Sequence, residues 1–356
     1  MIFNKDNTEW ESGIHPIFLG QSPALYDSVN TNYPKLFELY KQQKAQDWAE
    51  NEINLEQSRI DMISCPNEIR DLMVKNLAYQ WEADSVASRS IAPLFAPFVT
   101  NSEAWAALLK NSEIEVLHAL TYSEIVRQCF EFPDEVFKEV MHNENVLSRL
   151  DKIASVFETL QINGARKILN VDAEEEFYSS AMMGMVALYL LERIQFMASF
   201  AATFAVVEQG WFQGIGKLVQ KIMQDELYCH SAVDEEILKI EMNTKRGQHW
   251  FIEHKDEIKL LIDEVVKTEK SFANYLFSEN RQVVGLNVSI LSDWIDYCAA
   301  PVYKLFGFES VAGTAIPYME NWLDLNKFQI ALQEGSGNNY LLNVIIDDFN
   351  DSIIYD

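Results

Sequence analysis

The stretch Glu115-Val-Leu-His118-Ala-Leu-Thr-Tyr122-Ser-Glu-Ile125 is the most informative part of the sequence, because it places an acid, an imidazole and a phenol at helical spacing. Steps of three, four and three residues put Glu115, His118 and Tyr122 on one helix face with the final isoleucine. The predicted helix around them covers about 102–130. Because burying an unpaired carboxylate costs several kcal/mol, this face is predicted to hold a functional site as well as a packing surface.

Three further predicted helices carry acidic side chains on faces that are otherwise apolar. The four helices together supply four carboxylates and two imidazoles, and lysine and arginine are scarce on these faces. Two divalent cations with bridging carboxylates match this count, and such an oxygen-rich set suits iron or manganese better than zinc. The candidate ligands are Asp84 in the helix over 66–94, Glu115 and His118 over 102–130, Glu192 over 174–209, and Glu226 with His230 over 213–243.

One acid from each of two helices and Glu-x-x-His from each of two others is the ligand pattern of ferritin-like dimetal carboxylate bundles. We therefore predict an all-α, ferritin-like helical bundle around a dimetal-carboxylate centre. The 13 glycines and 9 prolines among 356 residues are few chain breakers, which favours long helices. A second Glu-x-x-His, Glu139-Val-Met-His142, lies among polar residues and is predicted to be a surface pair. The remaining histidines, His15, His249 and His254, have no such partner.

The charge balance and the cysteines limit the partners and the compartment. Lysine and arginine number 28 against 54 acidic residues, a net charge of −26, which argues against a nucleic-acid partner because phosphate binding needs a basic face. The four cysteines are widely spaced and form no CxxC pair, which indicates neither a disulfide framework nor a zinc ribbon. A reducing, cytoplasmic setting fits this usage, and the first residues contain no apolar segment typical of a signal peptide.

The segment from Ala181 to Val207 has the length and apolarity of a membrane span. Its only charged residues, Glu192 and Arg193, lie near its middle, where each is costly in a bilayer. We therefore favour a buried helix of a large bundle over a transmembrane helix, and expect no membrane association.

The chain is predicted to have three parts: an N-terminal arm over 1–32, a helical domain over 33–325 and a flexible C-terminal tail over 326–356. Scattered Gly, Pro, Ser and Asn mark the arm, and Glu334-Gly-Ser-Gly-Asn-Asn339 indicates a hinge. Beyond the hinge, acidic and apolar residues alternate without a lysine or arginine. Two interpretations of this tail stay open: a frayed terminus, or an apolar peptide that docks on a partner protein.

Four segments resemble the small, radical-generating subunit of class I ribonucleotide reductase. The resemblance extends from the region of Trp48 to the tail, and an aspartate followed at this distance by Glu-x-x-His-x-x-x-Tyr is its most specific part. The segments are Asp84-Ser-Val-Ala-Ser-Arg-Ser90, Glu115-Val-Leu-His118-Ala-Leu-Thr-Tyr122, Leu191-Glu192-Arg-Ile-Gln-Phe196 with Ser199-Phe-Ala-Ala-Thr-Phe204, and Gln224-Asp225-Glu226.

The resemblance implies a role for each candidate ligand. One metal would be held by Asp84, Glu115 and His118, and the other by Glu192, Glu226 and a histidine, with Glu115 and Glu226 bridging. The metals, iron or manganese, would activate dioxygen. Tyr122 would then be oxidised to a stable radical in a dry pocket, for which Phe196, Phe200 and Ile222 are the expected apolar neighbours. The alternative is that Tyr122 is an ordinary core tyrosine.

The resemblance also implies a path for the radical and a set of partners. Trp48, Asp225 and His118 match a hydrogen-bonded electron path, and Tyr340 matches a tail relay, although Tyr355 is another tail tyrosine. A separate large subunit would reduce the ribonucleotide, so this chain would hold no nucleotide site of its own. The chain is also expected to form a homodimer.

Two departures from the family pattern affect the second metal position. The fourth helix has Glu226-Leu-Tyr-Cys229-His230, so an ungapped match puts Cys229 where the family has histidine. We favour His230, because positions i+3 and i+4 both lie on the face of residue i and a local π-bulge would help the histidine reach. A thiolate beside an oxidising centre would itself be oxidised. Gln224 also stands where the family more often has arginine, which leaves the choice of metal open.

Two other functions would use similar ligands. A related dimetal oxidase or desaturase acting on a hydrophobic substrate would need neither a tail tyrosine nor the Trp48 path. A metal-storage protein or purely structural bundle would account for the ligands, but not for Tyr122 or the tail.

Overall fold

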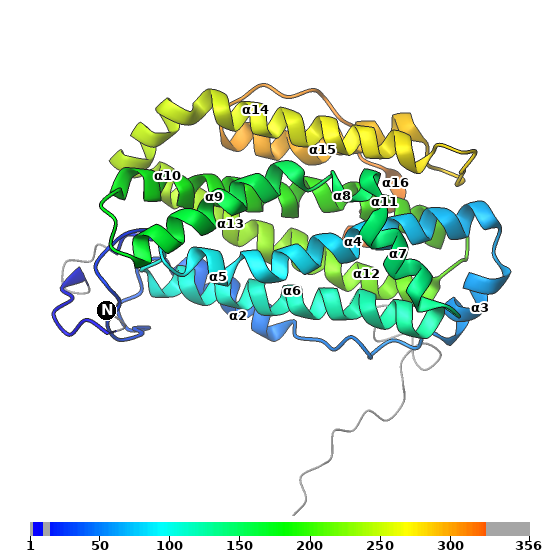
Figure 1. The fold of residues 1–356 in the computed structure, drawn as a ribbon, viewed down its shortest axis with the longest axis horizontal. Helices are drawn as coiled ribbons and strands as arrows, with labels where there is room; N and C mark the ends of the chain where they lie inside the picture. The colour runs from blue at the N-terminus through cyan, green and yellow to red at the C-terminus, as the bar shows by residue number, and fades with distance from the viewer. Residues whose placement is uncertain (1–2, 10–14, 325–356) are drawn as a thin grey trace, which may run out of the picture.

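The computed structural model describes residues 3–9 and 15–324, and within this part of the chain the secondary structure is helical, with two isolated β-bridges and no strand. The long helices run along a common axis and form an elongated bundle (Figure 1). The predicted tail, including Tyr340 and Tyr355, lies outside the described residues. The all-α fold is therefore confirmed.

The longer elements include all four predicted helices that carry candidate ligands, two of them as pairs of helices joined by a π turn. They are α2 (Pro34–Ala45), α4 (Asn67–Ser90), α6 (Ser102–Cys129), α7 (Pro133–His142), α9 (Asp151–Ile168), α10 (Glu174–Leu190), α11 (Phe196–Val207), α12 (Gln213–Asp225), α13 (Ser231–Met242), α14 (Lys245–Leu276) and α15 (Val288–Leu305). Shorter helices are α3 (Glu56–Ser64), α5 (Ala92–Phe95), α8 (Glu144–Leu147) and α16 (Pro317–Leu323). Two π-helical turns, η1 (Leu191–Gln195) and η2 (Glu226–His230), join α10 to α11 and α12 to α13.

Local signals account for where several helices begin. Asn101, Thr244 and Asn287 each accept a backbone N–H of the following first turn, and so cap α6, α14 and α15. Pro34 opens α2, a position where the missing N–H of proline has no cost. The short helices α3, α5 and α16 were not predicted, because so few residues carry little periodic signal.

The end of helix α2 determines where Trp48 lies. Helix α2 stops at Ala45, so the tryptophan lies in the connection between α2 and α3. Part of the predicted N-terminal arm packs on the bundle, since Ile17 and Phe18 are buried and the N–H of Leu19 donates to the carbonyl of Phe98.

The apolar segment that resembles a membrane span is a core helix of the bundle. The continuous run Glu174–Val207 is long and apolar enough to cross a bilayer, yet 94% of its most apolar 18-residue window is buried within the fold. An all-round apolar helix of this kind is expected in the core of a large bundle. This run carries η1, and with it Glu192, through the middle of the protein.

Candidate metal centre

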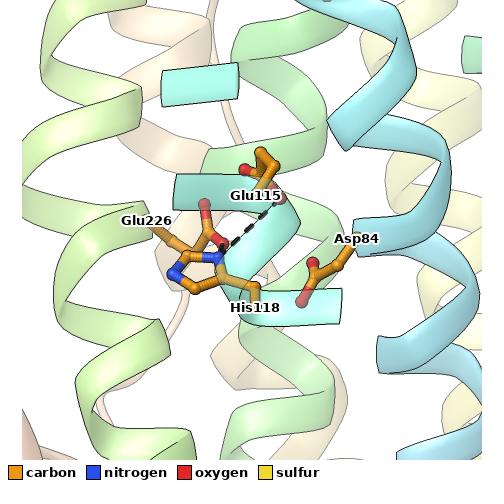
Figure 2. A group of neighbouring side chains, drawn as sticks. All are labelled: Asp84, Glu115, His118 and Glu226. Carbon is orange, nitrogen blue, oxygen red and sulfur yellow. Dashed lines mark ion pairs between the residues drawn. The ribbon is translucent and has the colours of Figure 1, made fainter. Parts of the chain in front are cut away.

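Four helical elements bring the six candidate ligands to one place in the core. Helix α4 supplies Asp84 and α6 supplies Glu115 with His118, while the π turns supply the rest. Figure 2 shows the side chains from α4, α6 and η2 pointing toward one another. All six side chains are fully buried, namely Asp84, Glu115, His118, Glu192, Glu226 and His230.

The first group of potential ligands comprises Asp84, Glu115, His118 and Glu226, whose ligand atoms lie within 4.8 Å of one another. Nδ1 of His118 is 2.9 Å from Oε1 of Glu226 and 3.8 Å from Oε2 of Glu115. Two carboxylates therefore approach the same imidazole nitrogen, as they would approach a shared cation.

The second group comprises Glu115, Glu192, Glu226 and His230, again with ligand atoms within 4.8 Å. Nδ1 of His230 lies 2.9 Å from Oε1 of Glu115 and 3.0 Å from Oε2 of Glu226. Both groups thus contain Glu115 and Glu226, which is the arrangement of two bridging carboxylates. Glu226 of η2 thus approaches His118 of α6, and Glu115 of α6 approaches His230 of η2.

The π turn η2 determines which residue follows Glu226 into the cluster. A π turn accommodates one extra residue, so the residue four positions after Glu226 comes to the inner face. That residue is His230. Cys229 points elsewhere, and its thiol donates to Oε1 of Gln46 at 3.1 Å. The extra residue between Glu226 and His230 predicted a π-bulge at this position. No feature of the sequence predicted η1 around Glu192.

Several carboxylate oxygens of the cluster have no hydrogen-bond partner. Among the described residues, both oxygens of Asp84 and of Glu192 and Oε2 of Glu115 are buried without a hydrogen bond. Burial, together with the neighbouring Glu115, raises the pKa of Asp84 well above its ordinary value, and burial with Glu226 does the same for Glu192. Such orphaned oxygens around two imidazoles fit two divalent cations, which would replace the missing partners.

The two histidines remain strongly basic because acids surround them. Burial alone would lower the pKa of His230, yet Glu226, with hydrogen bonds to Glu115 and Glu226, raises it to about 10. Burial likewise opposes the raised pKa of His118, for which Glu226 is the largest favourable influence. Without metal ions, protons on these rings therefore offset part of the charge of the cluster.

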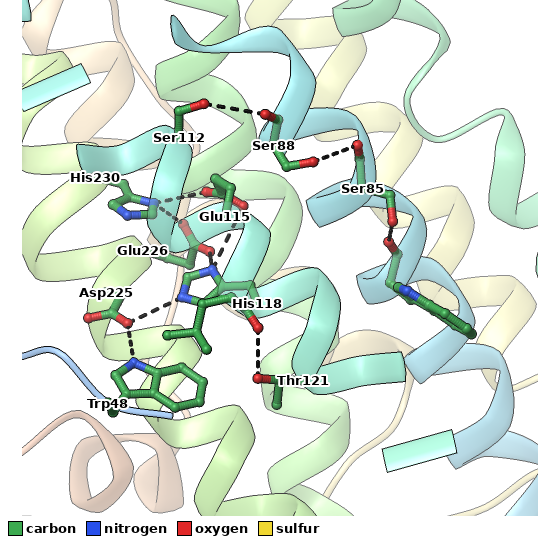
Figure 3. A network of polar contacts seen from close by, with 12 residues as sticks. Trp48, Ser85, Ser88, Ser112, Glu115, His118, Thr121, Asp225, Glu226 and His230 are labelled. Atoms are coloured by element: carbon green, nitrogen blue, oxygen red, sulfur yellow. Dashed lines mark hydrogen bonds and ion pairs between the residues drawn. The ribbon is translucent and has the colours of Figure 1, made fainter. Parts of the chain in front are cut away.

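A chain of hydrogen bonds leads from the cluster toward the surface (Figure 3). Nε2 of His118 lies 3.2 Å from Oδ2 of Asp225, and the indole N–H of Trp48 donates to the same oxygen at 2.7 Å. The Trp48 ring also stacks on His118, with 6.0 Å between ring centroids and 25° between planes. The three residues that the resemblance grouped as a path are therefore in contact.

Tyr122 lies in the same core, 1% exposed, and its hydroxyl has no hydrogen-bond partner among the described residues. Burial raises the pKa of Tyr122 well above its ordinary value, and Asp84 adds to the increase. Phe196, Phe200 and Ile222 belong to the same buried core cluster. The phenol is thus kept dry and neutral close to the first group of ligands.

Two features of the site escaped the sequence analysis. Asp234 is fully buried one turn after His230, and its two oxygens have no hydrogen-bond partner among the described residues. Arg149, also buried, pairs with Glu269 and donates to the carbonyl oxygen of Gln195 at 3.0 Å, at the end of η1. The i,i+4 spacing on a buried face could have indicated Asp234, whereas no local pattern marks Arg149.

The remaining histidines stay away from the cluster. His142 is exposed on α7, and its Nδ1 lies 2.9 Å from the backbone oxygen of Lys138. His254 pairs with Ser179 at 3.0 Å, and His249 is exposed near Glu253.

Comparison with known proteins assigns most of the chain to one family. The family model described as "Ribonucleotide reductase, small chain" matches residues 26–315. The ribonucleoside-diphosphate reductase subunit beta of Buchnera aphidicola subsp. Baizongia pistaciae is 29% identical, over 98% of this chain and 96% of that protein. The ribonucleoside-diphosphate reductase 1 subunit beta of Salmonella typhimurium is 25% identical, over 93% of this chain and 92% of that protein.

Solved structures show the same fold at lower identity. The R2 subunit of ribonucleotide reductase from Clostridium botulinum aligns with a TM-score of 0.78 at 21% identity, over 91% of this chain and 98% of that chain. A protein from Streptococcus sanguinis described as dimanganese(II)-NrdF aligns with a TM-score of 0.66 at 17% identity, over 84% of this chain and all of that one. The ferritin-like architecture is therefore confirmed.

Proposed function

Because the chain belongs to the ribonucleotide reductase small-chain family, we propose that it is the radical-generating subunit of a ribonucleoside-diphosphate reductase. The observation that carries the proposal is the buried pair of ligand groups that share Glu115 and Glu226, with the dry phenol of Tyr122 in the same core. The enzyme would convert ribonucleotides to deoxyribonucleotides for DNA synthesis. The family assignment favours this function over a dimetal oxidase or desaturase and over metal storage.

We propose iron as the resident metal and manganese as the second candidate, because the carboxylate-rich set suits both. Asp84, Glu115 and His118 would hold one ion, Glu192, Glu226 and His230 the other, and Glu115 and Glu226 would bridge. When bound, the two ions would supply the redox chemistry that couples dioxygen to one-electron oxidation of a side chain.

The chain's own residues prepare Tyr122 for that oxidation. Oxidising a neutral phenol removes one electron and one proton, so a base must be close. Asp84 is the carboxylate with the strongest electrostatic influence on Tyr122, and its oxygens have no competing hydrogen bond. We propose that Asp84 accepts the hydroxyl proton after a side-chain movement, because the phenol and this carboxylate form no hydrogen bond with each other among the described residues. The apolar surroundings would then protect the radical from quenching.

Transfer of the radical would use the hydrogen-bonded contact of Trp48, Asp225 and His118. When Trp48 gives up an electron toward the cluster, Oδ2 of Asp225 is placed to accept the indole proton, since the two groups already share a hydrogen bond of 2.7 Å. Tyr340 in the tail would continue the path to the large subunit.

The partner of this subunit is a ribonucleotide reductase large subunit, as membership of the small-chain family implies. We further propose that the chain forms a homodimer and acts in the cytoplasm, without a membrane or nucleic acid. The net charge of −26 supports the last point. The acidic and apolar residues 326–356 would dock on the large subunit.

The direct test loads metal-free protein with Fe(II) or Mn(II), adds oxygen, and records electron paramagnetic resonance spectra with metal analysis. A tyrosyl radical and two ions per chain are expected, followed by deoxyribonucleotide formation when the large subunit is added. Two bound ions without a radical or turnover would instead favour a storage or structural role.

Deleting residues 340–356 tests the docking segment separately. The truncated protein should retain the radical but fail to support reduction by the large subunit. If turnover survives the deletion, the tail does not carry the radical path.

A further inference from the structure

The two histidines of the cluster have unequal surroundings. His118 presents Nδ1 to the carboxylates and has Asp225 at its other nitrogen, Nε2, at a distance of 3.2 Å. His230 also presents Nδ1 to the carboxylates, but its Nε2 is buried and has no hydrogen-bond partner in the part of the chain that the structure describes. A metal-ligating histidine almost always donates its second N–H to a carboxylate, a carbonyl or water, which fixes its tautomer and orientation.

The approximate symmetry of the site shows why the second partner is missing. Asp225 immediately precedes Glu226, and its carboxylate contacts Nε2 of His118 on the opposite helix. The corresponding residue before Glu115 is Ile114, a buried apolar side chain that cannot accept a hydrogen bond. The crosswise arrangement that orients His118 is therefore unavailable to His230.

Asp234 is the other unsatisfied group on this side of the cluster. It lies four residues after His230 on the buried face of α13 and is fully buried. Neither of its oxygens has a hydrogen-bond partner within residues 3–9 and 15–324. Among the described residues, no lysine or arginine forms an ion pair with it. Burial raises the pKa of Asp234 well above its ordinary value, while His230 acts in the opposite direction.

We propose that Asp234 is the positioning carboxylate of the second metal position, accepting the Nε2–H of His230 when Nδ1 of that ring binds the ion. Residues four apart on a helix have Cβ atoms about 5–6 Å from each other, so side-chain rotation is enough to join these two groups. The hydrogen bond selects the Nε2–H tautomer, which leaves the lone pair of Nδ1 directed at the cluster. Asp234 thus orients His230 as Asp225 orients His118.

Thermal stability and metal affinity together distinguish a positioning residue from a purely structural one. An unpartnered buried carboxylate destabilises the metal-free protein, so removing its charge should raise thermal stability or leave it unchanged. The same change should weaken metal binding, because the ring of His230 loses its orienting partner. Stability and metal affinity should therefore move in opposite directions.

The inference rests on the proposed dimetal function, and the test uses Mn(II) binding to the full-length, metal-free protein without large subunit or oxygen. Free Mn(II) is counted by its electron paramagnetic resonance signal during titration. For Asp234→Asn we expect the weaker of two dissociation constants to rise by about 10- to 100-fold, with the tighter one unchanged. Asp234→Glu, which keeps a carboxylate, should recover part of the affinity.

Glu241→Gln provides a matched control on the same helix. Glu241 is 4% exposed and accepts the hydroxyl of Tyr178 at 2.7 Å, so its substitution should lower the melting temperature and leave Mn(II) affinity unchanged. The proposal is overturned if Asp234→Asn leaves both dissociation constants within about twofold, or if it lowers the melting temperature as the control does. If the unsubstituted protein binds fewer than two ions, the dimetal function itself has failed.

Discussion

The indole N–H of Trp48 donates to Oδ2 of Asp225 at 2.7 Å, although the two residues lie 177 positions apart in the chain. The same oxygen lies 3.2 Å from Nε2 of His118, so one carboxylate joins a half-buried tryptophan to a fully buried candidate ligand. This contact gives the proposed radical path a continuous set of proton positions, and its disruption is the first of five predictions.

Trp48→Phe keeps an aromatic ring at the contact, but it removes the N–H and puts a side chain there that is much harder to oxidise. We expect two metal ions and the tyrosyl radical to remain, while deoxyribonucleotide formation with the large subunit falls to background. Product assays alongside radical quantification check this result. Substituting Trp250, which donates to Ser179 at 3.0 Å in another part of the bundle, should leave turnover intact. Normal turnover by Trp48→Phe would remove it from the path.

Tyr122→Phe removes a hydroxyl that has no hydrogen-bond partner among the residues described by the structure. Because no bond is lost, the free energy of unfolding should change by less than about 1 kcal/mol or increase slightly. The metal content should stay at two ions, while the tyrosyl signal disappears from the electron paramagnetic resonance spectrum. Persistence of the same signal would assign the radical to another tyrosine.

His230→Ala and Cys229→Ala distinguish the two candidates at the second metal position. His230 contacts both bridging glutamates, whereas Cys229 contacts Gln46. We expect His230→Ala to reduce metal content from two ions to one per chain, as measured by elemental analysis after gel filtration. Cys229→Ala should retain two ions, and the opposite pattern would show that the thiolate is the ligand.

Arg149→Met breaks a buried ion pair. The Arg149 Nε donates to Oε1 of Glu269 at 2.9 Å, and Tyr79 and Phe272 flank the guanidinium with ring centroids 3.2 and 3.6 Å from its central carbon. Leaving Glu269 buried and unpaired should cost about 3–5 kcal/mol of unfolding free energy, measured by urea denaturation.

The double variant Arg149→Met/Glu269→Leu serves as its control. Removing both charges should restore much of the stability, because two apolar side chains can fill the same space. A double variant as unstable as Arg149→Met would mean that lost packing, rather than the uncompensated charge, causes the effect.

Glu82 should make the metal-free protein less stable as the pH rises. Burial raises its pKa to about 7, with Arg149 opposing and Asp151 adding to the increase. Between the ordinary glutamate value near 4.5 and pH 7, the folded state binds more protons than the unfolded state, so stability falls with rising pH across this window. The difference in unfolding free energy between Glu82→Gln and the unsubstituted protein should therefore grow in favour of the variant over this window. A constant difference would contradict the raised pKa.

Local sequence patterns were enough to predict the helical fold and the inner faces of the helices. Spacing of 3.6 residues is a local property, so apolar periodicity located α4, α6 and the long run Glu174–Val207 and put Asp84, Glu115, His118 and Glu192 on buried positions. Charge and glycine content excluded other fold and partner classes, but carried no information about chemistry.

How these faces meet depends on contacts between segments far apart in the chain. The π turn η2 brings His230 rather than Cys229 to the cluster, and Glu115 and Glu226 belong to both ligand groups because α6 and η2 approach each other. The isolation of Asp234 likewise depends on what surrounds it. Burial, orphaned oxygens and shared ligands are relations between segments far apart in the chain, and no local pattern encodes them.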